Sequence, residues 1–136
     1  MKTFAACGLA AVTVWSPIAG AGEIRLVSRA YPTQFADTAS GTSVLSGLSE
    51  DGRRAVFVST ATYLVPGQVD SNAGNDVFVR DRSTANTTLV SHSVTSPSTA
   101  ANAPSDSAVV SADGRLIAFA SAATDLVPGM SGPGAG

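Results

Sequence analysis

The chain has 136 residues and a formal net charge of −2, and only 13 % of its residues are charged. This near-neutral balance excludes the strongly basic surface on which nucleic-acid binding depends, so no nucleic-acid partner is expected. A single cysteine excludes an intrachain disulfide framework and a multi-cysteine zinc site.

The first 21 residues have the three-part pattern of a secretory signal peptide. Lys2 gives a positive start, residues 4–15 are uncharged and largely apolar, and Ala19 and Ala21 stand at positions −3 and −1 of a cleavage site. The apolar run is shorter than the ~20 residues of a membrane-spanning helix, and a buried N-terminal helix is the alternative interpretation. We expect cleavage after Ala21, export to the periplasm or the extracellular space, and no membrane insertion of the mature chain.

The mature chain, residues 22–136, repeats itself with a period of about 62 residues. Residues 49–67 and 111–129 are identical at twelve of nineteen positions, and both contain Ser-x-Asp-Gly-Arg and Leu-Val-Pro-Gly. Leu-Val-Ser also occurs twice, at 26–28 and at 89–91. The repeats predict three units: the last strand of one over about 24–29, a full unit over about 43–93, and the first half of another over about 106–129.

Each full unit is predicted to contain four short antiparallel strands. The first covers 43–49, and Asp51-Gly52 after it favours a two-residue type I′ turn. The second, 55–59, is apolar on both faces, which indicates a central strand. The third runs over 76–80, and the Thr-rich fourth, 87–93, is polar enough for a sheet edge. The next unit repeats the first two strands at 106–111 and 117–121.

Four antiparallel strands in about 60 residues, with the inner strands buried on both faces, favour a blade of a β-propeller. A β-sandwich is the first alternative, but its strands normally alternate polar and apolar residues. A parallel β-helix is the second, but its coils are shorter than this period. The prediction is an all-β fold of antiparallel four-stranded propeller blades, with fewer than two full blades after the signal peptide.

The string S-E-D-G-R-R-A-V-F-V-S-T-A-T-Y-L-V-P-G, followed by N-D-V-F-V-R-D-R and T-T-L-V-S, resembles the TolB-like (WD-like) propeller repeat of exported bacterial proteins. The resemblance covers most of residues 23–129. It implies a propeller whose Asp-Gly pairs and strand-end Asp residues are structural. Propellers of this family usually have six or more blades, so we expect a partial propeller, a fragment of a larger one or a chain that other copies complete.

A loop before the third strand contains a candidate metal site. Asp70, Asn72 and Asp76 place carboxylate and amide oxygens at short spacing, and such oxygens are the ligands that calcium prefers. The loop does not match an EF-hand, because Asn75 stands where that motif requires glycine. The alternative is that these side chains form local hydrogen bonds to the backbone of the loop.

The sequence offers no catalytic constellation. His92 is the single histidine, no G-x-S-x-G motif occurs, and acids such as Asp51, Asp113 and Asp81 stand in turns or at strand ends. We therefore predict that the chain is not an enzyme and has no cofactor, and calcium is the one candidate ion. Arg80-Asp81-Arg82 is interpreted as a local charge network, with an anion or partner contact as the alternative.

The leading functional hypothesis is an exported, non-enzymatic propeller module for protein–protein interaction or scaffolding, with a protein or further blades as its partner. The first alternative is a remnant of the propeller domain of a secreted hydrolase or peptidase. The second is a calcium-dependent surface-binding module.

Overall fold

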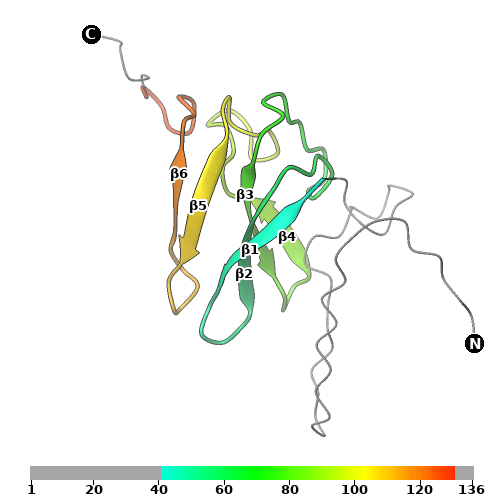
Figure 1. Cartoon of the computed structure of the whole chain (residues 1–136), viewed down its shortest axis with the longest axis vertical. Coiled ribbons are helices and arrows are strands. Elements are labelled where there is room, and N and C mark those ends of the chain that lie inside the picture. Colours follow the sequence, from blue (N-terminus) through cyan, green and yellow to red (C-terminus); the bar gives the residue numbers. More distant parts are fainter. Residues whose placement is uncertain (1–40, 131–136) are drawn as a thin grey trace, which may run out of the picture.

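The computed structural model of the chain describes residues 41–130, and the following account concerns that part. Within it the chain forms two antiparallel β-sheets and no helix (Figure 1). This confirms the predicted all-β class. The predicted signal peptide over 1–21 and the predicted strand over 24–29 lie outside the described residues.

The larger sheet is a four-stranded antiparallel meander with the order β1-β2-β3-β4. Its strands are β1 (Ser43–Leu48), β2 (Arg54–Ser59), β3 (Asp76–Asp81) and β4 (Asn86–Leu89). The central position of β2 and the edge position of β4 are as the sequence predicts. However, β4 ends at Leu89 rather than Ser93, because the amides of Val90 and Ser91 both donate to the Val77 carbonyl and pairing with β3 stops advancing.

The second sheet contains two antiparallel strands, β5 (Ser105–Val110) and β6 (Ile117–Ser121). It repeats the irregularity of the first sheet: β1 is bulged between Leu45 and Gly47, and β5 between Asp106 and Val109. The repeated sequence therefore produces a repeated structure. We call the part around β1–β4 unit 1 and the part around β5 and β6 unit 2.

The Ser-x-Asp-Gly-Arg hairpins close in the same way in both units, but not as the predicted type I′ turn. Ser49 pairs with Arg54, so the loop contains four residues, and of these only Gly52 has a positive φ, +64°. The Asp51 carboxylate accepts from Ser49 Oγ at 2.6 Å and from the Arg53 amide at 2.9 Å. The prediction was wrong because this carboxylate organises the loop, and Asp51 itself need not adopt positive φ.

The inner strands β2 and β3 of the larger sheet are buried on both faces, as expected for their apolar sequences. On one side, the phenylalanine face, Phe57 of β2 stacks on Phe78 of β3 with ring centroids 5.6 Å apart. Loop residues cover these rings, namely Ala61, Leu64, Val65 and Ala100. On the other side, the valine face, unit 2 covers the sheet. The buried residues of the valine face are Val56, Val58, Val77 and Val79.

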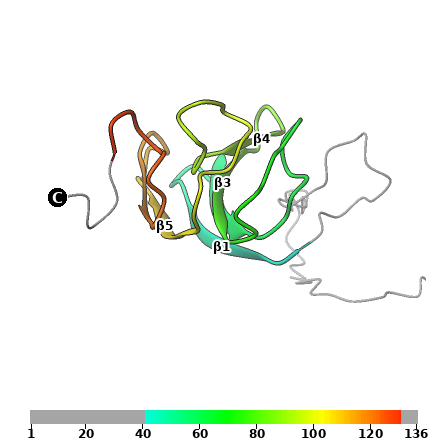
Figure 2. The ribbon, with the colours of Figure 1, turned by 90° about the horizontal axis from the view of Figure 1, so that it is seen from above.

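Unit 2 lies flat against the valine face of unit 1 (Figure 2). The side chains that make this contact are Ala108, Val110, Ile117 and Phe119. Phe119 stands in the repeat where Phe57 stands in unit 1. The phenylalanine face of unit 2 therefore packs on the valine face of unit 1. The two units face the same way in the stack, so unlike faces meet.

Candidate functional site

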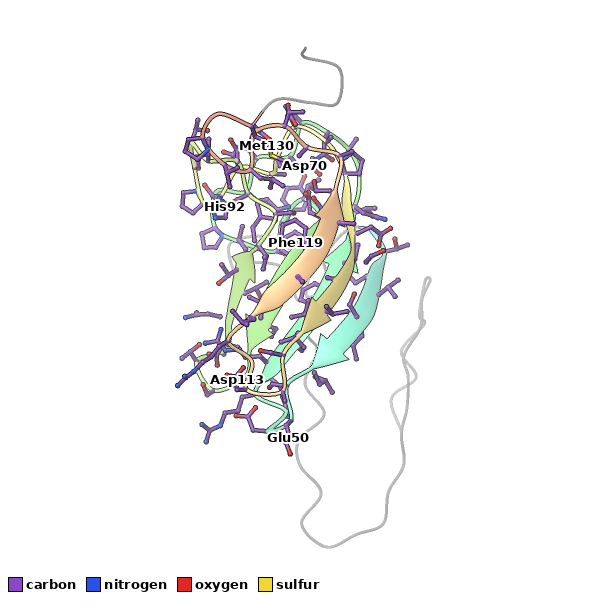
Figure 3. The ribbon with its side chains drawn as sticks, turned by 90° about the vertical axis from the view of Figure 1, so that its left-hand side faces the viewer. Glu50, Asp70, His92, Asp113, Phe119 and Met130 are labelled. Carbon is purple, nitrogen blue, oxygen red and sulfur yellow. The ribbon has the colours of Figure 1, made fainter. Side chains whose placement is uncertain are left out.

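The stacked units have two distinct ends. The turn end carries the two Ser-x-Asp-Gly-Arg hairpins and the turn between β3 and β4. The loop end gathers the longer connections, residues 60–75, 90–104 and 122–130. Figure 3 shows Glu50 and Asp113 at the turn end and Asp70, His92 and Met130 at the opposite end. The calcium candidates and the single histidine thus belong to the loop end.

Charged side chains at the turn end form a structural network. Arg82 Nη1 donates to the Gly52 carbonyl at 2.9 Å, and Arg54 Nη2 lies 3.9 Å from Asp81 Oδ2. The Asp81 carboxylate also accepts from the amides of Ser83 and Thr84, and bonds from the Ser83 hydroxyl and these amides hold the pKa of Asp81 below its ordinary value. These contacts match the local-network interpretation of Arg80-Asp81-Arg82.

The turns of the two units are also joined to each other. The Glu50 amide donates to the Ala112 carbonyl at 2.8 Å, which links one hairpin to the next. Gly114 is buried at this junction with φ +71°, and a Cβ atom there would lie 2.9 Å from Arg54 Cδ. The close approach requires glycine both for its backbone angle and for its lack of a side chain.

Hydrogen bonds between loops make the loop end a continuous structure. The Val69 amide donates to Ser98 O at 2.9 Å, and the Ala100 amide donates back to Val69 O at 2.8 Å. The Val94 amide donates to Asp125 O at 2.7 Å, which ties the connection from unit 1 to the last loop of unit 2. Three loops that are far apart in sequence are therefore held together at this end.

The predicted calcium ligands Asp70 and Asn72 are engaged in hydrogen bonds with the backbone. Asp70 Oδ1 accepts from the amides of Asn72 at 3.0 Å and Ala73 at 3.2 Å. Asn72 Oδ1 accepts from the Gly74 amide at 2.6 Å, and its Nδ2 donates to Ala101 O at 2.7 Å. These bonds favour the local hydrogen-bonding interpretation, and calcium binding stays the alternative.

The third predicted ligand, Asp76, is only 1 % exposed at the start of β3. Its Oδ1 accepts from Ser91 Oγ at 2.9 Å, and the same hydroxyl oxygen accepts from the Val77 amide at 3.0 Å. Burial raises the pKa of Asp76 to about 6; the Ser91 bond opposes the rise and the charge of Asp70 adds to it. Within residues 41–130, no three His, Cys, Asp or Glu side chains gather closely enough to hold a metal.

Sequence reasoning missed the pairing of Asp76 with Ser91. The two residues are 15 positions apart, and the only available signal was the recurrence of Leu-Val-Ser, which marks Ser91 as part of the repeat. His92, next to it, is half-buried after the end of β4. Its Nδ1 lies 2.8 Å from the Ser93 carbonyl, where it donates a bond that fixes the ring locally.

The loop end also exposes apolar side chains. Half of the large hydrophobic residues that are exposed in the described part belong to its loops, namely Tyr63, Val69, Val94, Val127 and Met130. The arginines of residues 41–130 all lie at the turn end or on the strands that lead to it. The loop end therefore combines exposed apolar side chains with the carboxylates of Asp70 and Asp125, and it lacks cationic side chains.

Comparison of the chain with protein-family models, curated proteins and solved structures finds no match. Residues 41–130 contain no helix with the length and apolar character that crossing a membrane requires. Function must accordingly be inferred from the geometry of the two units.

Proposed function

We propose that the chain is an exported, non-enzymatic module of the β-propeller type that binds a protein partner through its loop end. The observation that carries the proposal is the face-to-face stacking of two repeat units, in which the phenylalanine face of unit 2 packs on the valine face of unit 1. Propeller blades are four-stranded antiparallel sheets that bury their faces against neighbouring blades in this way.

Two further features support stacking as a repeated design. Both hairpins use the same hydrogen bonds: Ser111 Oγ donates to Asp113 Oδ1 at 2.6 Å, as Ser49 Oγ does to Asp51 Oδ1. The backbone bond from Glu50 to Ala112 joins the hairpins themselves, so neighbouring units are in register at the turn end. A sequence that repeats both its turns and its packing faces specifies the same relation from each unit to the next.

The loop end is the proposed binding surface. Loops placed on a rigid β-scaffold commonly carry recognition, and these loops hold exposed apolar side chains such as Tyr63 and Val94. The hydrogen bonds that tie Val69 to Ser98 and Val94 to Asp125 keep these loops in place before a partner binds. A preformed surface loses less conformational entropy on binding.

Site-specific photo-crosslinking tests this proposal in the cells that export the protein. A photoreactive phenylalanine analogue replaces Tyr63 or Val94 at the loop end, and Thr84 in the turn between β3 and β4 as the matched control. We expect a discrete crosslinked protein from the first two positions and none from Thr84. Equal crosslinking from all three positions, or none from any, would overturn the proposal.

A further inference from the structure

Within the described residues, each unit leaves apolar side chains exposed on one sheet face, although loops cover Phe57 and Phe78 on the phenylalanine face of unit 1. On the phenylalanine face of unit 1, Leu45 and Leu48 of β1 are 57 % and 53 % exposed. On the valine face of unit 2, Val109 is 58 % exposed, and Ala118 and Ala120 are exposed beside it. These two surfaces lie on opposite sides of the stack, since unit 2 covers the valine face of unit 1.

The chain itself contains an interface between faces of these two kinds. Leu48 occupies the repeat position of Val110, which packs on the valine face of unit 1. Ala118 and Ala120 occupy the positions of Val56 and Val58, which receive that contact. The part of the phenylalanine face of unit 1 that β1 leaves exposed is thus of the type that packs on a valine face. The exposed face of unit 2 is a valine face without an occupant in the described part.

The volumes of the side chains on these faces are also compatible. Inside the chain, unit 2 approaches Gly47 so closely that a Cβ atom there would lie 3.1 Å from Val110 Cγ1. Val109 stands at the position of Gly47 in unit 2 and would push an incoming unit away. Unit 2 has alanine at 118 and 120, where unit 1 has valine at the equivalent positions 56 and 58. The smaller side chains leave room next to Val109, so the summed side-chain volume of the two valine faces differs little.

We propose that a second copy of this chain is the partner of these faces, with the phenylalanine face of unit 1 in one copy packed on the valine face of unit 2 in the next. The inference rests on the proposed function, because it treats the units as successive blades. The contact joins two different surfaces, so each copy keeps one face free for another copy, and repeated addition leads to a closed ring or a filament.

Sedimentation velocity on the exported protein, with variants that block one face each, tests the proposal. Leu48→Arg places a charge on the phenylalanine face of unit 1, and Ala118→Arg places one on the valine face of unit 2. Thr84→Arg adds the same charge at the exposed turn between β3 and β4 and is the control. Far-UV circular dichroism shows whether each variant is folded, and Leu45→Arg and Ala120→Arg replace any variant that is not.

We expect the wild type and Thr84→Arg to sediment as assemblies of more than one copy, and each blocked variant as a single copy. An equimolar mixture of Leu48→Arg and Ala118→Arg retains one intact pair of faces and is expected to form a 1:1 heterodimer. Single-copy sedimentation of the wild type up to hundreds of micromolar, wild-type assembly by both blocked variants, or a mixture that stays monomeric would overturn the proposal.

The outcome is separable from that of the photo-crosslinking experiment. A monomeric wild type that still crosslinks a partner from Tyr63 would remove self-assembly and leave the proposed function in place. Assembly of the wild type without a crosslink from the loop end would remove the proposed function and leave self-assembly in place.

Discussion

Replacing the buried carboxylate of Asp76 changes how stability depends on pH. The pKa of Asp76 rises from an ordinary 3.8 to about 6 in the folded chain, mainly because the carboxylate is buried. The folded state therefore binds this proton more tightly than the unfolded state, and protonation favours folding. The contribution of Asp76 to stability is fully present below pH 3.8 and is lost as the pH rises through 6.

The size of the effect follows from the shift in pKa. Each unit corresponds to 1.36 kcal/mol, so the rise of about two units corresponds to about 3 kcal/mol. Asp76→Asn keeps a neutral acceptor for Ser91 Oγ at every pH. At pH 4 the carboxyl of the unfolded chain is already about half ionised. Relative to its value at pH 4, the free energy of unfolding of the wild type at pH 7 should therefore fall about 2 kcal/mol below that of the variant.

Urea unfolding followed by far-UV circular dichroism at pH 4 to 8 measures this difference. Asp113→Asn is the control, because hydrogen bonds from Ser111 Oγ and the Arg115 amide lower the pKa of Asp113. Its stabilising contribution is present above pH 3.8 and is lost only as the pH falls below that value, so its difference from wild type should be flat from pH 5 to 8. A flat profile for Asp76→Asn, or a wild type that gains on the variant as the pH rises, would refute the reasoning.

Three further predictions concern the turns and the loop end. Gly114→Ala should lower the free energy of unfolding by about 1 kcal/mol more than Gly67→Ala in urea titrations. Both glycines have positive φ, but a Cβ atom at Gly67 meets nothing within 4 Å. Equal losses would contradict the close packing of the two hairpins. Ser49→Ala should lower the free energy of unfolding by about 1–2 kcal/mol, because Ser49 Oγ forms hydrogen bonds with both the Asp51 carboxylate and the Arg54 amide. Ser46 is exposed, so Ser46→Ala should change it by no more than about 0.5 kcal/mol. Indistinguishable values for the two variants would exclude the hydrogen-bonded hairpin. Millimolar calcium should leave the Tm of the exported protein unchanged, because the side-chain oxygens of Asp70 and Asn72 already accept hydrogen bonds from backbone amides. A rise in Tm that Asp70→Asn removes would instead support the calcium hypothesis.

The positions of the strands were predictable because their signals are local. Apolar residues at consecutive positions identify β2 and β3 as inner strands, and the repeated Asp-Gly pair marks the hairpins that join β1 to β2 and β5 to β6. The hairpin geometry was not predictable from residue preferences alone, since it depends on the hydrogen bonds of the Asp51 carboxylate with Ser49 and Arg53.

The features that depend on contacts across the fold were out of reach of the sequence. The bond between Asp76 and Ser91 joins the start of β3 to the segment after β4, and no local pattern pairs them. The candidate metal residues were recognised as a group of oxygens, but whether those oxygens are free depends on the path of the loop. Asp70 illustrates this, because the turn that follows brings two amides onto its carboxylate.

The stacking of unit 2 on the valine face is the central claim, and a disulfide between the units tests it most directly. In a Cys7→Ser background, the test variant combines Gly47→Cys with Val110→Cys, because the Val110 side chain lies against Gly47. The control variant combines Gly47→Cys with Val109→Cys, because the exposed Val109 side chain points to the opposite face. We predict that the folded protein forms an intramolecular disulfide in the first combination only, detected by mass and by electrophoretic mobility without reductant. Failure of the 47–110 pair to crosslink, or equal crosslinking of the 47–109 pair, would contradict the stacked arrangement.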